Sequence, residues 1–160
     1  MEDGLIASVL LQLEQSGLAT WIRESGVLYG YPLILFLHTM GLSTVVGISA
    51  VIDLRLLGVA STIPLASLDR LFRVLWAGFA LTAVTGTLLF VADATKHTSN
   101  PAFVVKLAFV AGGVATLALV RSRVFHRHQS GAFLAAASLA CWLVAITSGR
   151  LMAYIAEFIS

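Results

Sequence analysis

Long stretches without a charged residue constrain the fold of this chain more than any other feature. The stretch from Ser25 to Ile52 holds 28 residues without a formal charge, and Val74–Ala92 and Gly131–Gly149 hold 19 residues each. About 20 apolar residues are enough for a helix to cross the hydrocarbon core of a bilayer. Each of these stretches is therefore predicted to be a transmembrane helix.

A fourth span is less obvious, because Leu107–Val120 has only 14 uncharged residues. Extending the helix back to Pro101, a favourable first-turn residue after Asn100, gives the required length. This extension places Lys106 more than one turn inside the helix. We therefore predict an all-α membrane protein with one transmembrane domain over residues 1–160, a four-helix bundle with spans at about 27–52, 74–93, 101–121 and 131–154.

Composition supports lipid as the solvent of this chain. Hydrophobic residues make up 59% of it and charged residues only 11%, whereas soluble domains carry about 25% charged residues. A single cysteine, Cys141, rules out a disulfide within the chain and a cysteine-based metal site. A net charge of +2 without a basic stripe gives no indication of nucleic-acid binding.

The N-terminal residues 5–22 are predicted to form an amphipathic helix on the membrane surface. Apolar residues recur in it at one-turn spacing: Leu5, Ile6, Val9, Leu10 and Leu13. The acidic start Met1-Glu2-Asp3 is unlike a cleaved secretory signal. Trp21 and Tyr29 suit the level of the lipid headgroups.

The basic residues predict the orientation in the membrane. The loops after spans one and three hold Arg55, Arg70, Arg73, Arg121, Arg123 and Arg127. The opposite side holds Arg23 and Lys96, with Lys106 and Arg150 in or at the ends of spans. By the positive-inside rule both basic loops are cytoplasmic and both termini lie on the outer side.

Small residues recur along the spans at helical spacing, and we interpret them as packing positions within the bundle. They are Ser43 with Gly47, then Gly78, Thr82 and Gly86, and finally Gly112 and Gly113 with Thr116.

His38 is the clearest functional candidate, because an ionisable group at membrane depth costs roughly 2.5–3.5 kcal/mol on insertion scales. It lies roughly 16–18 Å along the first span at 1.5 Å per residue, near the middle of the bilayer. Lys106, Asp93 and Arg150 belong to the outer half of the bundle, and with Tyr29, Tyr31 and Tyr154 they are candidates to converge there.

Each of these residues also has a purely structural interpretation. His38 can donate to a backbone carbonyl or bond to Thr39 or Ser43, and Lys106 can extend its ammonium to the membrane surface. Arg150 and Asp93 can pair at the membrane edge. Asp53 and Arg55 end the first span, do not face each other, and are expected to contact headgroups or loop residues.

The chemistry that fits a deep histidine in an apolar bundle is axial ligation of a b-type haem. Gly41 and Gly47 leave room near His38 for a flat macrocycle. Because no second deep histidine exists, Lys106 is the remaining deep nitrogen base, and it would bind iron as an uncharged amine. His97, His126 and His128 fall in loops and do not have the spacing of a structural zinc site.

Several motifs resemble an uncharacterised family of small four-span bacterial membrane proteins. They are Leu37-His38 with Gly41, Asp53-Leu54-Arg55-Leu56-Leu57-Gly58, Trp76-Ala77-Gly78-Phe79, Asn100-Pro101-Ala102-Phe103 before Lys106, and Gly149-Arg150-Leu151 with Ala153-Tyr154. The likeness covers nearly the whole chain and implies a multi-pass protein of the bacterial cytoplasmic (inner) membrane. It implies no activity.

A more distant resemblance is to the HemJ-type protoporphyrinogen oxidase and to CopD-type copper-export domains. Leu37-His38, Gly47 and Arg55 are similar to one HemJ-type helix, and Lys106-Leu107-Ala108 to the start of another. The resemblance implies that His38 and Lys106 hold a haem. The sequence departs from the HemJ-type Leu-Pro-Arg motif, since Asp53-Leu54-Arg55 stands in its place.

The first functional hypothesis is therefore a membrane redox protein that binds haem b, with a haem-dependent oxidoreductase activity of the HemJ type as its enzymatic form. His38 is the axial ligand, Lys106 is the second ligand or a propionate partner, and Arg150, Tyr31 and Tyr154 hold propionates. Its partners are the lipid bilayer, a second copy of the chain or a redox protein.

Two alternatives remain open. One is a non-enzymatic accessory subunit or a small metal or ion transporter, for which the soft ligands in the spans are Met40, Met152 and Cys141. The other is a lipid or quinone binder that uses Trp76 and Trp142.

Overall fold

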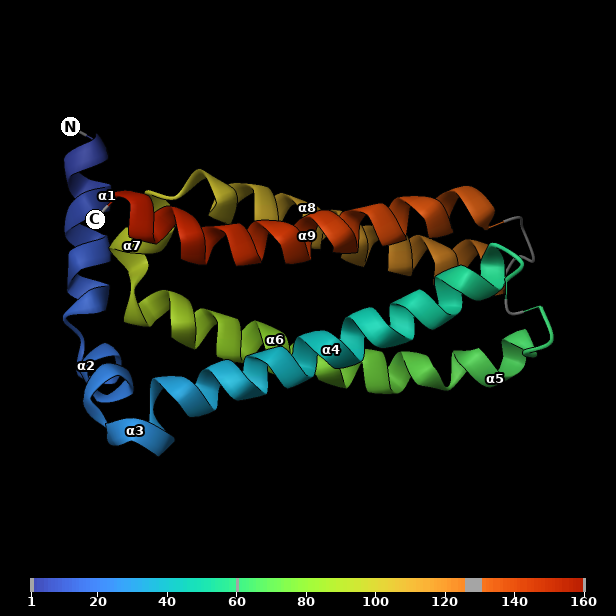
Figure 1. Cartoon of the computed structure of the whole chain (residues 1–160), viewed down its shortest axis with the longest axis horizontal. Helices are drawn as coiled ribbons and strands as arrows, with labels where there is room; N and C mark the ends of the chain where they lie inside the picture. Colours follow the sequence, from blue (N-terminus) through green and yellow to red (C-terminus); the bar gives the residue numbers. More distant parts are fainter. Residues whose placement is uncertain (1, 60, 126–130, 160) are drawn as a thin grey trace.

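Four long helices form the protein, as Figure 1 shows. The structure is a computed structural model that describes residues 2–59, 61–125 and 131–159, and no strand occurs in those ranges. The long helices are α4 (Tyr31–Leu56), α6 (Leu71–Ala92), α8 (Pro101–Val120) and α9 (Ala132–Ile159). Each contains a segment long and apolar enough to cross a membrane. The predicted multi-pass bundle of four transmembrane helices is confirmed.

The four helices are arranged as two antiparallel pairs. α4 packs along α6 and α8 packs along α9, and α4 also contacts α9. The short helix α5 (Leu65–Asp69) lies at one end of the bundle, and α7 (Ala94–Thr98) lies at the other beside α1. We call these the α5 end and the α1 end. In Figure 1 the two pairs lie closest at the α5 end and diverge toward the α1 end.

The N-terminal segment is not the single helix that we predicted over residues 5–22. It forms α1 (Glu2–Glu14) and α2 (Gly17–Glu24), and the chain bends by 51° between them. The break has a local cause, since the Ser16 side chain accepts a hydrogen bond from the Ala19 amide and so caps α2. α1 runs crosswise over the end of the bundle, where a helix at the membrane surface would lie (Figure 1).

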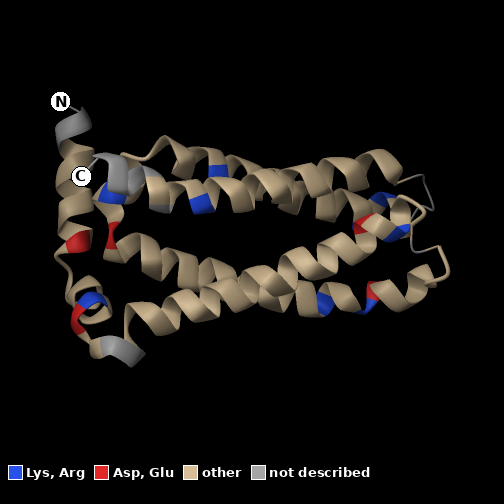
Figure 2. Cartoon of the chain, in the orientation of Figure 1, with Lys and Arg blue, Asp and Glu red and all other residues tan. Residues whose placement is uncertain are grey.

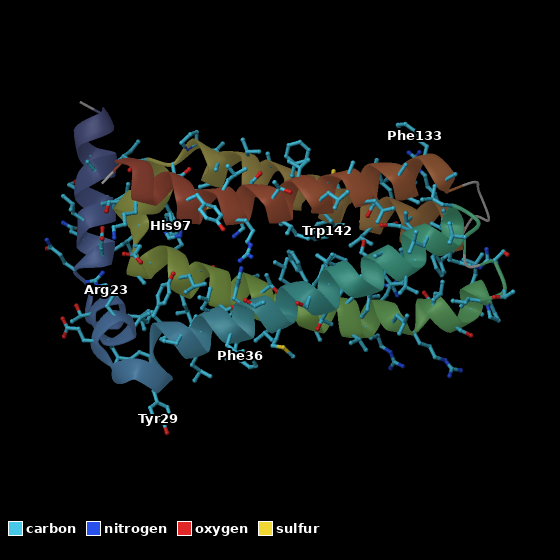
Figure 3. The ribbon with its side chains drawn as sticks, in the orientation of Figure 1. Arg23, Tyr29, Phe36, His97, Phe133 and Trp142 are labelled. Carbon is cyan, nitrogen blue, oxygen red and sulfur yellow. The ribbon has the colours of Figure 1, made fainter. Side chains whose placement is uncertain are left out.

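The first span begins later than the predicted residue 27. A short helix α3 (Gly26–Tyr29) precedes it, and Gly26 has φ +83°, a conformation that favours glycine. Gly30 then turns the chain into α4. Tyr29 is 72% exposed beside this turn and points away from the protein (Figure 3).

Arg23 attaches the N-terminal helices to the bundle. Its Nη1 donates to the Ala92 carbonyl at 2.6 Å, and its Nη2 donates to the Glu14 carbonyl at 2.8 Å. These carbonyls belong to the last turns of α6 and α1, where backbone acceptors lack partners within the helix. The Glu14 carboxylate in turn accepts from the Thr95 hydroxyl at 2.6 Å.

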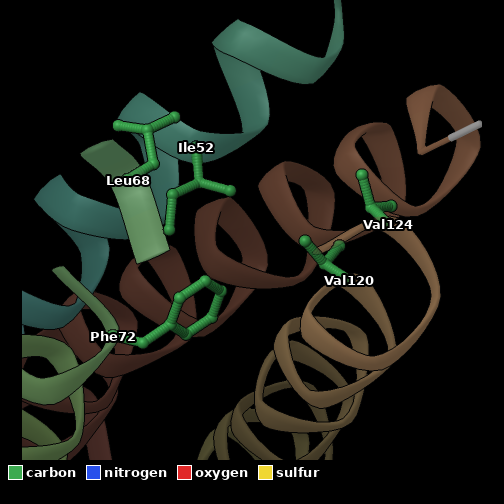
Figure 4. Close-up of a cluster of buried hydrophobic side chains, with 5 residues drawn as sticks. All are labelled: Ile52, Leu68, Phe72, Val120 and Val124. Atoms are coloured by element: carbon green, nitrogen blue, oxygen red, sulfur yellow. The ribbon is translucent and has the colours of Figure 1, made fainter. Parts of the chain in front are cut away.

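Buried apolar side chains form clusters along the whole length of the bundle. One of them, at the α1 end, packs α2 against α4 and α6 and consists of Ile22, Ile34, Leu89 and Ala92. Figure 4 shows the cluster at the α5 end, which consists of Ile52, Leu68, Phe72, Val120 and Val124. A third cluster, Val45, Leu75, Leu117 and Trp142, lies farther along the same helices. Many other large apolar side chains face outward, among them Phe36 and Phe133 (Figure 3). Such a surface suits lipid and not water.

Small residues bring the helices of each pair together, as their spacing predicts. A methyl group on Gly41 would meet the Thr82 hydroxyl and the Gly78 carbonyl, and one on Gly113 would lie 2.9 Å from the Trp142 ring. The predicted packing pair of Ser43 and Gly47 is wrong, because both are exposed and a methyl group on Gly47 would meet nothing within 4 Å. The space at Gly41 is filled by α6, so it does not leave the room for a flat macrocycle that we expected there.

Candidate functional site

His38 faces α6 from the half of α4 nearer the α1 end. It is the eighth residue of a 26-residue helix that begins at Tyr31, so it lies closer to the start of the span than the bilayer middle that we predicted. Its Nδ1 lies 3.1 Å from the Thr82 carbonyl oxygen and 3.1 Å from the Thr85 hydroxyl oxygen. The Thr85 hydroxyl donates its own proton to the Leu81 carbonyl at 2.6 Å, so it accepts from His38. Both partners of Nδ1 are acceptors, which assigns the hydrogen of the neutral ring to Nδ1 and leaves a lone pair on Nε2.

These bonds connect His38 to another helix and not to its own neighbours. The Thr39 hydroxyl donates to the Leu35 carbonyl, and Ser43 is exposed. Of the structural roles expected for His38, the bond to a backbone carbonyl is present. It uses only one of the two ring nitrogens.

Gly86 provides the space for the imidazole. A methyl group at this position would lie 3.0 Å from His38 Cε1 and 3.4 Å from Nδ1, closer than side chains normally pack. The ring therefore lies directly over the α6 backbone, and glycine is the residue that allows it.

Lys106 packs across the other helix pair in a similar way. Its Cδ, Cε and Nζ lie 3.7, 3.8 and 3.9 Å from the point that a methyl group on Gly149 would occupy. Within the part of the chain that the structure describes, its ammonium makes no hydrogen bond or ion pair. The Lys106 side chain therefore packs against α9 at Gly149.

The registers of the helices bring the two bases to one level. The contact of Gly113 with Trp142 aligns α8 with α9. Lys106 lies seven residues from Gly113 toward the α1 end, and Gly149 lies seven residues from Trp142 in the same direction. The Ser49 and Ser138 hydroxyls lie 3.2 Å apart and align α4 with α9.

His38 lies eleven residues from Ser49 toward the α1 end, and Gly149 lies eleven residues from Ser138 in the same direction. The two residues are therefore at the same level of the bundle. His38, Gly86, Lys106 and Gly149 thus form one layer across all four long helices, which we call the His38–Lys106 layer.

Three further candidates for the site are exposed residues outside the His38–Lys106 layer. Tyr31 is 36% exposed, Tyr154 is 60% exposed, and Arg150 is also exposed. No hydrogen bond or ion pair among the described residues connects them to His38 or Lys106, so their role as propionate ligands stays a prediction. The expected ion pair between Arg150 and Asp93 is absent among the described residues. Asp93 pairs instead with Lys96, whose Nζ lies 4.0 Å from the carboxylate.

Asp53 is the polar residue whose place the sequence analysis predicted wrongly. Headgroups or loop residues were expected around it, yet its exposed fraction is 0%. The cause is that α4 continues to Leu56, so Asp53 lies inside the helix and faces the bundle. The Ser49 hydroxyl, one turn earlier, donates to its Oδ2 at 3.2 Å. The four-residue spacing of Ser49 and Asp53 is the signal that would have revealed this. Arg55 does contact the loop, donating from Nε to the Ile63 carbonyl at 2.5 Å.

The remaining candidate metal ligands are dispersed. Among the described residues no group of three or more His, Cys, Asp or Glu side chains gathers. His97 bonds to the Asp93 carbonyl at 2.7 Å, while His126 and His128 lie outside the described residues. Met40 is 50% exposed on the outside of α4, so it does not accompany His38 into the interface.

Comparison with protein-family models finds no match, and no characterised protein or solved structure matches this chain significantly.

Proposed function

We propose that this protein is a membrane redox protein that binds haem b, with Nε2 of His38 as an axial ligand of the iron. The observation that carries the proposal is the pair of 3.1 Å contacts at His38 Nδ1, because they assign the free lone pair to Nε2. A ligating histidine commonly donates its other ring N–H to a carbonyl, which orients the ring and increases its basicity.

Lys106 is the second part of the proposed site. It belongs to the other helix pair at the level of His38, so a group held by both bases would lie between the two pairs. As an uncharged amine Lys106 would be a second ligand of the iron, and as an ammonium it would pair with a propionate. Arg150, Tyr31 and Tyr154 are the further residues proposed for the propionates.

The donor set fits haem better than a bare metal ion. An imidazole and an amine are two nitrogen ligands, and the porphyrin would supply the other four. When bound, haem supplies one-electron redox chemistry. The protein's own residues orient the imidazole through Thr82 and Thr85 and keep the α4–α6 contact tight through Gly86. The likeness of Leu37-His38 and Lys106-Leu107-Ala108 to HemJ-type sequences supports the same two residues.

The orientation in the membrane is part of the proposal. We place the protein in a bacterial cytoplasmic membrane with both termini on the outer side. The arginines at the α5 end, which include Arg55, Arg70 and Arg73, support a cytoplasmic location for that end. Figure 2 shows that charged residues gather toward the two ends of the helices, with few along their length.

An optical spectrum of the purified protein tests the function. The protein is expressed with a haem precursor, extracted in mild detergent, and measured in oxidised and reduced form, with haem and metal content determined per chain. We expect a Soret band that shifts on reduction, with about one haem per chain. If no Soret band remains with the protein after unbound haem is removed, the proposal is refuted. A bound transition metal without haem would support the transporter alternative.

A further inference from the structure

A buried carboxyl group lies at the α5 end of the bundle, away from the His38–Lys106 layer. Asp53 on the last turn of α4 has an exposed fraction of 0%. Its Oδ2 accepts from the Ser49 hydroxyl at 3.2 Å, and the Ser49 oxygen lies 3.2 Å from that of Ser138 on α9. Its Oδ1 is inaccessible and has no hydrogen-bond partner among the described residues.

No positive charge in the described part of the chain compensates Asp53. The basic residues of the α5 end contact other groups: Arg121 lies 3.9 Å from Asp69, and Arg55 donates to the Ile63 carbonyl. Arg70 and Arg73 are exposed. A buried carboxylate without a counter-ion costs several kcal/mol, and such a group commonly takes up a proton instead.

The surroundings of Asp53 fit a proton better than a metal cation. Three oxygen-bearing side chains meet there, those of Asp53, Ser49 and Ser138. Hard cations such as Ca²⁺ take about six to eight oxygen ligands. The neighbouring residue Ile52 belongs to the apolar cluster of Figure 4, which supplies none.

The two serines stabilise the deprotonated form as well. Ser49 donates to Oδ2, and Ser138 can donate to Ser49, so two hydroxyls in a row support a negative charge on the carboxyl group. Burial favours the acid and the serine chain favours the carboxylate, which allows both states in one fold. One turn beyond Ser138, Trp142 has a buried Nε1 without a partner among the described residues, and its ring belongs to the apolar cluster in the middle of the bundle.

We propose that Asp53 is a proton-binding site of this membrane protein. Its carboxyl group is an uncharged acid in the resting state. It releases one proton to the aqueous phase at the α5 end and becomes a carboxylate that accepts from Ser49, whose oxygen can in turn accept from Ser138. It then takes one proton back from the same phase. This site stands on its own contacts and does not depend on haem binding at His38.

Infrared spectroscopy of the full chain in lipid nanodiscs tests this proposal. Aspartate labelled with ¹³C at the side-chain carboxyl identifies bands from the four aspartates Asp3, Asp53, Asp69 and Asp93. At neutral pH we expect one label-sensitive C=O band of a protonated acid, and we expect it to disappear reversibly as the pH is raised. Asp53→Asn removes the band. The matched control Asp69→Asn, an exposed aspartate at the same end, leaves it in place.

Ser49→Ala keeps the carboxyl group and provides a second readout if the Asp53 variant does not fold. Removing the donor to Oδ2 shifts the C=O band to higher frequency, and Ser138→Ala shifts it less. Three results overturn the proposal: no protonated band in the labelled wild-type protein at neutral pH, a band that survives Asp53→Asn, or a band that persists at all pH values at which the helices remain folded.

Discussion

Replacing Gly86 by alanine perturbs the candidate site at a single point. The added methyl group would lie 3.0 Å from His38 Cε1 and 3.4 Å from Nδ1, so the imidazole must move by a few tenths of an ångström. The bonds from Nδ1 are already 3.1 Å long, near the upper end of the normal range for N–H···O bonds. Moving the ring away from α6 therefore weakens both of them.

The expected cost follows from two effects. Overpacking a tight contact costs about 1–3 kcal/mol, and losing a hydrogen bond costs about 0.5–1.5 kcal/mol. Alanine returns about 0.5–1 kcal/mol as a better helix former than glycine. We expect Gly86→Ala to lower the free energy of unfolding by about 1–3 kcal/mol. Since the ligand loses its orientation, haem affinity should fall about 10–100-fold.

Two assays separate these effects. Thermal unfolding of the haem-free protein in detergent measures the packing cost, and haem titration followed by Soret absorbance measures the affinity. Gly47→Ala is the matched control in α4, because its methyl group would meet nothing within 4 Å. We expect Gly47→Ala to lower neither the unfolding temperature nor the haem affinity. If Gly86→Ala unfolds like the wild-type protein and binds haem equally well, the placement of His38 over α6 is wrong.

Three further substitutions test the packing of the helices. Gly113→Ala would place a methyl group 2.9 Å from the indole ring of α9, and we expect a loss of about 1–3 kcal/mol against the Gly47→Ala control, measured by thermal unfolding. Arg23→Gln removes the donors to two helix C-terminal carbonyls, so it should destabilise by roughly 0.5–1.5 kcal/mol, while Arg73→Gln, an exposed control, should not. Asn100→Ala removes the side-chain cap of α8, whose oxygen accepts from the Ala102 amide at 3.0 Å, and should cost about 1 kcal/mol in the same assay.

The transmembrane bundle could be predicted from the sequence because uncharged apolar stretches of about 20 residues are typical of helices that cross a bilayer. The contacts of Gly78 and Gly86 follow the same logic, since small residues at one-turn spacing allow close approach. The break at Ser16 had a visible signal as well, a serine before an apolar segment. The prediction of one helix rested on the apolar spacing of Leu5 to Leu13, which ends before Ser16 and gave no information about the break.

The site required information that one sequence does not contain. The presence of His38 and Lys106 in the spans was visible, but their common level depends on the register of α4 and α8 against α9. That register is set by contacts such as Ser49 with Ser138, which lie 89 positions apart in the chain. Asp53 was misplaced because the end of the helix was taken from the first charge, whereas the helix continues beyond it and buries that charge.

Removal and chemical replacement of the imidazole test the central claim most directly. His38→Gly removes the imidazole side chain and leaves a space in its place. Free imidazole added to this variant can enter that space and supply the same nitrogen ligand from solution. We predict that His38→Gly loses the haem spectrum, that imidazole restores it, and that the control His97→Ala retains it. A His38→Gly protein whose oxidised and reduced spectra equal those of the wild type without imidazole would contradict the account.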